Sequence, residues 1–210
     1  MARGGCSFSY GGSSGWEPSS AGGAAHRVKH LGVLAALLLC SAVWAQGFGG
    51  AAEEQWYDGL RETGLPREVV AILPVEVPPE GPGFPTKVLF VFVYIDERTL
   101  ESRTRWREVL ADYVDKNAVL VWAYSQMPFV PQVRFDPLSL WFSQTGWEFH
   151  PSAEDFVPVD GDFLAGEVYS GKPVAAIVLL GEGFTPAESL VVHYGDLAEA
   201  IIPLGSQGDR

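Results

Sequence analysis

The chain has 210 residues, with 14 basic and 26 acidic side chains and a formal net charge of −12 at pH 7. This length allows one domain with extensions or two small domains. Aromatic residues make up 12% and charged residues only 19%, which favours a packed core over general disorder. The acidic balance argues against nucleic acid and against an anionic membrane surface as partners, because both require a basic face.

The first 45 residues have the composition of a leader followed by a secretory signal. Residues 1–25 are rich in Gly and Ser, residues 26–30 are basic, and residues 31–45 are apolar. A basic segment, a short apolar segment and small residues before a cut are typical of a secretory signal. We therefore predict cleavage after Ala45 and a secreted or cell-envelope location. The alternative is an uncleaved signal, which is the only membrane contact we expect.

The predicted cut has consequences for the cysteines and for the start of the chain. Cys6 and Cys40 both precede it, so the mature chain has no disulfide and no Cys-based metal site. Lipidation of Cys40 is disfavoured. The pattern that bacterial lipoprotein signals resemble has a small residue directly before the cysteine, where this chain has Leu39. Signals usually carry their positive charge close to the first residue. We therefore hypothesise that translation starts at Val28.

The segment after the cut leads into one mostly β domain. Residues 46–85 are predicted to be a linker and an edge segment, because Pro74 cannot sit in a central strand. Residues 86–205 are predicted to form the domain itself, and residues 206–210 a tail.

The domain opens with two apolar stretches that are predicted to flank a helix. Residues 87–95 and 118–124 are apolar almost throughout, as in buried strands. Residues 97–116 are predicted to form one amphipathic helix, which Asp96 can cap. Strand, helix and strand could form a parallel crossover in an α+β fold. We favour instead a β-sandwich on which the helix packs as a long connection.

Residues 135–204 are predicted to be short strands separated by Gly, Pro and Asp turns. Residues 138–143 alternate between apolar and polar positions, which indicates a half-buried strand. Residues 174–180 are apolar at every position and predict a central strand covered on both faces. Several short strands at this spacing indicate an antiparallel sandwich.

The turn and strand pattern resembles immunoglobulin-like domains of secreted bacterial proteins of unknown function. The residues that carry the resemblance are Phe135-x-Pro137, Gly146-x-x-Phe149-x-Pro151, Gly161-x-Phe163-x-x-Gly166-Glu167, Gly171 and residues 190–194. The resemblance covers about a third of the chain and implies an immunoglobulin-like antiparallel sandwich. It implies no catalytic residues, and we expect no cofactor.

Motifs for chemistry are sparse in this sequence. It contains no G-x-S-x-G, S-x-x-K, H-E-x-x-H or P-loop pattern. Only His150 and His193 follow the predicted cut. Either histidine could be a general base in a small hydrolase, as could the acidic loops. A lone surface histidine is the commoner outcome, so we expect no catalytic residue.

Two groups of residues are candidates for a binding site. Asp155, Asp160 and Asp162 lie around turns and could supply oxygen ligands to calcium, although no EF-hand spacing is present. Trp141, Trp147 and Phe149 could form a flat aromatic platform for sugar rings or, more simply, pack inside the fold. We thus expect a non-catalytic binding or assembly module with an unknown protein or polysaccharide partner. The alternatives are a carbohydrate-binding module that uses these aromatics and a small hydrolase.

Overall fold

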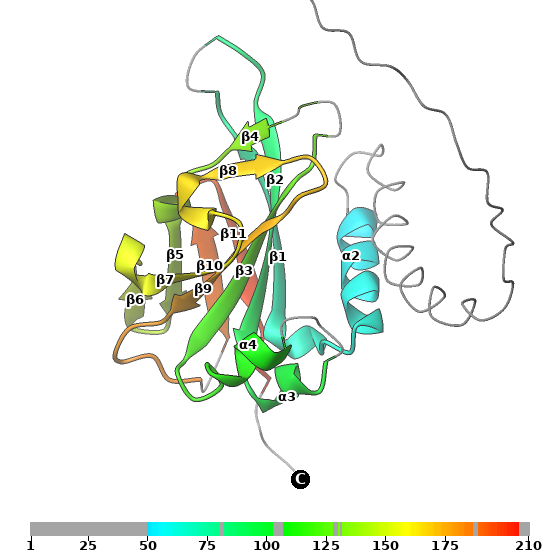
Figure 1. Cartoon of the computed structure of the whole chain (residues 1–210). Coiled ribbons are helices and arrows are strands. Elements are labelled where there is room, and N and C mark those ends of the chain that lie inside the picture. The colour runs from blue at the N-terminus through cyan, green and yellow to red at the C-terminus, as the bar shows by residue number, and fades with distance from the viewer. Residues whose placement is uncertain are drawn as a thin grey trace, which may run out of the picture. The chain divides into compact units, whose positions relative to one another are not determined.

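The structure, a computed structural model, describes residues 50–79, 82–102, 107–127, 130, 132–186 and 189–205. The predicted signal and its cut after Ala45 lie outside the described residues, as does the tail. The described chain is mostly β, with antiparallel sheets and few helices, as the sequence predicts (Figure 1). Within the described ranges, no helix combines the length and the apolar character that crossing a membrane requires.

The larger sheet has five strands in the order β1-β2-β3-β9-β7, and all neighbouring pairs are antiparallel. Its strands are β1 (Val70–Val77), β2 (Thr86–Ile95), β3 (Ala118–Ser125), β7 (Phe156–Asp160) and β9 (Val174–Leu179). The mostly apolar strands β2, β3 and β9 occupy its centre and are buried on both faces along most of their length. This confirms the prediction of a central strand at residues 174–180.

The smaller sheet has four strands in the order β11-β10-β5-β6, again all antiparallel. Its strands are β5 (Leu140–Gln144), β6 (Trp147–Phe149), β10 (Leu190–Tyr194) and β11 (Ala198–Ile202). A separate two-stranded ribbon pairs β4 (Gln132–Arg134) with β8 (Glu167–Tyr169). Single 3-10 turns span Arg67–Val69, Pro137–Ser139, Ala153–Asp155 and Phe163–Ala165.

Aromatic side chains from facing strands fill the space between the two sheets. Phe90 of β2 stacks on Tyr194 of β10, with ring centroids 5.3 Å apart. Phe92 meets Phe142 of β5 edge to face at 6.2 Å. Because these four rings are buried, they join the sheets into one sandwich core.

The sandwich begins earlier in the chain than the predicted boundary at residue 86. Strand β1 pairs with β2 along its whole length, and it is an edge strand, as Pro74 predicts. Before it, helix α2 (Gly50–Glu62) packs Trp56 against Tyr124 of β3, with ring centroids 5.6 Å apart. The segment at residues 46–85 is therefore largely part of the fold, because it supplies a strand and a helix that bury apolar surface.

The connection between β2 and β3 differs from the single helix predicted for residues 97–116. It contains two short helices, α3 (Glu97–Leu100) and α4 (Arg107–Ala111), and residues 103–106 between them lie outside the described ranges. At the end of α3 the Ser102 hydroxyl donates to the Thr99 carbonyl at 2.6 Å, and such bonds compete with a continuing helix. Strands β2 and β3 are antiparallel neighbours, which rules out the parallel crossover of the α+β alternative.

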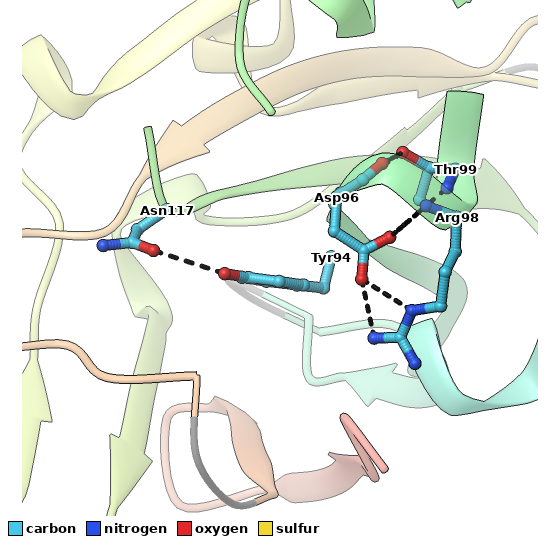
Figure 2. A network of polar contacts seen from close by, with 5 residues as sticks. All are labelled: Tyr94, Asp96, Arg98, Thr99 and Asn117. Atoms are coloured by element: carbon cyan, nitrogen blue, oxygen red, sulfur yellow. Dashed lines mark hydrogen bonds and ion pairs between the residues drawn. The ribbon is translucent and has the colours of Figure 1, made fainter. Parts of the chain in front are cut away.

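A polar network fixes this connection at the ends of the two strands (Figure 2). The Asp96 carboxylate accepts from the backbone N–H of Arg98 and Thr99, so it caps α3 as predicted. The same carboxylate pairs with the Arg98 guanidinium at 2.6 Å. Tyr94 donates to Asn117 Oδ1 at 3.3 Å. Burial, helped by the charge of Asp96, raises the pKa of Tyr94 to about 12.

Candidate functional site

One face of the four-stranded sheet is not covered by the sandwich, and we call it the outer face. In β10 the inward residues are buried and alternate with partly buried ones. In β11 the exposed Glu199 and Ile201 alternate with less exposed residues. Cross-strand pairing places eight residues on the outer face: Trp141, Ser143, Glu148, His150, Val191, His193, Glu199 and Ile201. These side chains define the candidate site.

Three rings form a stack across the outer face. Trp141 pairs with His193 in the β5–β10 register. The centroids of the two rings lie 3.6 Å apart, and the angle between the ring planes is 6°. His150, just after β6, stacks on Trp141, with a distance of 5.1 Å between the ring centroids and an angle of 16° between the ring planes. Because β5 lies between β10 and β6, the imidazoles approach Trp141 from opposite sides. The indole N–H donates to the Gly195 carbonyl at 3.1 Å, which fixes the central ring.

His193 connects this stack to two polar side chains. Its Nε2 lies 2.9 Å from the Ser143 hydroxyl, and its Nδ1 lies 3.6 Å from a carboxylate oxygen of Glu199. The tautomer that suits both contacts carries the proton on Nδ1, so that Nε2 accepts from Ser143. The imidazole side chain is only 12% exposed, whereas that of Glu199 is 71% exposed.

Burial is the main influence on the charge of His193. It lowers the pKa of His193 from the ordinary 6.5, because the charged imidazolium loses hydration. The carboxylates of Glu199 and Glu148 act in the opposite direction, and His150 adds a smaller lowering of this pKa. The His193 ring is therefore neutral at pH 7, and its protonation adds a positive charge to the outer face.

The outer face is acidic at neutral pH. Glu148 and Glu199 lie on β6 and β11, the two edge strands of the sheet, and both side chains are exposed. Among the described residues, neither has an ion pair with a lysine or an arginine. Over residues 50–205 the chain has 24 acidic and 10 basic side chains. The field at this site is therefore negative.

The predicted aromatic platform of Trp141, Trp147 and Phe149 is not one surface. The hairpin turn pairs Gln144 with Trp147 and Phe142 with Phe149, which places both β6 aromatics on the inward side and Trp141 on the outer face. Trp147 and Phe149 stack on each other at 5.9 Å, and Trp147 contacts the buried Phe184 at 5.4 Å. These two aromatics close one side of the core, which agrees with the alternative prediction that they pack inside the fold.

The predicted calcium ligands have local roles in their turns. The Asp155 carboxylate accepts from the Ser152 backbone and hydroxyl at 2.7 and 2.8 Å. Asp162 accepts from the Ala165 N–H at 3.1 Å and caps a 3-10 turn. Asp160 lies in β7, at the irregular register with β9. In the described part of the chain, no three metal-binding side chains gather into one group.

The sequence pattern does not reveal Ser143 and Glu199 as partners of His193. The alternation of apolar and polar residues along β10 places His193 on the polar side of the strand, which agrees with the outer face. Ser143 and Glu199 also occupy polar positions of alternating strands, but the alternation does not say which strands pair.

No family model, no curated protein and no solved structure matches the chain.

Proposed function

We propose that the protein is an exported, non-catalytic binding or assembly module that contacts a protein partner through the outer face. The observation that carries this proposal is the exposure of that face. The centre of the five-stranded sheet is buried on both sides, whereas Ile201 on the outer face remains 55% exposed. The basic, apolar and small-residue order of residues 26–45 supports export.

The strand order supports an immunoglobulin-like framework for this module. The run β2-β3-β9-β7 corresponds to the order A-B-E-D, and β6-β5-β10-β11 corresponds to C′-C-F-G. Strand β1 is then an addition beside the first strand. Such sandwiches commonly serve as scaffolds on the cell surface, but fold alone does not assign a function.

A protein partner fits the outer face better than a polysaccharide. Sugars stack on an exposed aromatic ring face, and both faces of Trp141 already contact an imidazole. Trp147 and Phe149 lie on the inward side. The exposed Ile201 and the half-buried Val191 instead offer apolar surface next to two carboxylates, a composition that suits a polypeptide.

Site-specific photo-crosslinking in the source cells tests this proposal. A photoreactive residue replacing Ile201 should give a discrete adduct with another protein. The same residue at Phe84, which is 90% exposed in the loop between β1 and β2, is the control and should give none. The absence of an adduct at Ile201, or equal adducts at both positions, would reject the outer face as the contact.

A second candidate function, ester hydrolysis, is favoured by the Ser143–His193–Glu199 arrangement. Ser143 lies at hydrogen-bond distance from an imidazole whose other nitrogen faces a carboxylate. In such a reaction the Ser143 oxygen bonds to the acyl carbon and its proton passes to Nε2. The alcohol then leaves with that proton, and water releases the acid.

A fluorophosphonate probe distinguishes the two candidates. A hydrolase should be labelled at Ser143, and both Ser143→Ala and His193→Gln should abolish the labelling. Ser139→Ala is the matched control, because its hydroxyl contacts Asp136 rather than an imidazole. If the purified protein takes up no label, the second candidate is rejected.

A further inference from the structure

We propose that the outer face binds a basic polypeptide and releases it on acidification; this inference rests on the proposed function. The face presents Glu148 and Glu199 at opposite edge strands of one four-stranded sheet. Neither carboxylate has a lysine or arginine partner among the described residues. A basic segment lying across the strands would supply the missing cations.

The centre of the face suits the stems of long basic side chains. Lys and Arg bury their methylene stems on apolar surface and keep their charged ends in water. The row next to the ring stack pairs Ile201 with Val191, and Val191 with Ser143. The stems can thus cover Ile201 and Val191 while the cationic groups reach the carboxylates at the two edges.

The charge of the whole domain favours the same class of partner. The 24 acidic and 10 basic side chains of residues 50–205 attract a cation and repel a second copy of this chain. An anionic polysaccharide meets the same repulsion. The basic polypeptide is therefore the occupant that the electrostatics select.

Protonation of His193 provides the release. The groups that face His193 are Glu199, Glu148, His150, Ser143 and Trp141. At neutral pH the two carboxylates dominate the charge of the face. In acid the protonated His193 becomes the ion-pair partner of Glu199 in place of the ligand.

Fluorescence anisotropy with a labelled oligolysine peptide and the full mature protein tests the inference. The variant with Glu148→Gln and Glu199→Gln should bind about tenfold more weakly than the wild type, as expected for the loss of two exposed ion pairs. The variant with Glu68→Gln and Glu154→Gln removes two exposed carboxylates elsewhere, and it should bind within about twofold of the wild type. Equal weakening in both variants would mean that only net charge is sensed and would overturn the site.

The pH arm uses the same peptide. Wild-type binding should weaken as the pH falls below about 6.5, because burial lowers the pKa of His193 below that ordinary value, and His193→Gln should lose this dependence. Binding of oligoglutamate in place of oligolysine would overturn the inference. If crosslinking at Ile201 captures a protein while oligolysine fails to bind, the inference fails alone and the proposed function stands.

Discussion

Replacing Phe92 by alanine tests the sandwich on which the outer face depends. Phe92 lies in the middle of β2, is fully buried, and contacts Phe90 and Phe142, each at 6.2 Å. The substitution removes a whole ring where two sheets meet, so it leaves a cavity as well as losing apolar burial. We expect a loss of about 3–5 kcal/mol in the free energy of unfolding.

Urea unfolding followed by circular dichroism measures this loss. The midpoint should fall while the slope stays the same, since the surface exposed on unfolding hardly changes. Phe84→Ala is the control, because its ring is 90% exposed and its removal should change stability by less than about 0.5 kcal/mol. A loss below about 1 kcal/mol for Phe92→Ala would refute the reasoning, because it would mean that the ring is not in a close-packed core.

Three further substitutions test individual features. Asp96→Ala removes the cap of α3 and the contact with Arg98, and should cost about 1–2 kcal/mol in chemical denaturation; no loss would mean that the cap is not needed. Gly166→Ala should destabilise clearly more than Gly146→Ala in thermal unfolding. Both glycines have positive φ, 66° and 75°, but an added Cβ would collide with the Phe135 carbonyl only at Gly166, and equal losses would contradict this packing. The lowered pKa of His193 means that the unfolded chain takes up this proton first as the pH falls. The wild type should therefore lose stability below about pH 6.5 relative to His193→Gln, whereas parallel stability curves would show that the ring is not desolvated.

The helix between β2 and β3 shows where periodicity misleads. The apolar spacing of residues 97–116 predicts one helix, but α3 ends after Leu100 and α4 after Ala111. One continuous amphipathic helix would place Val109 and Leu110 on the same apolar side, but Val109 is 40% exposed while Leu110 is buried. Local hydroxyl bonds at Thr99 and Ser102, which no hydropathy pattern contains, accompany the end of α3.

The candidate site shows a second limit. His193 could be placed on the polar side of its strand from alternation alone. Its neighbours could not be named, because Ser143 is 50 residues away along the chain. The pairing register of the β5–β6 hairpin likewise places Trp147 inward and Trp141 outward. A shift of this register by one residue would exchange the two faces of the strand.

The sequence by itself determined the apolar central strands, the antiparallel mostly β class, the edge position that Pro74 imposes on β1 and the cap at Asp96. These follow from short-range chemistry: alternation, apolar runs and the hydrogen-bonding limits of single residues. Only the tertiary structure decided which strands pair, and so brought Glu199, His193, Trp141 and His150 into one row across four strands. That choice depends on burying two whole sheet faces at once, a long-range balance that local sequence patterns do not encode.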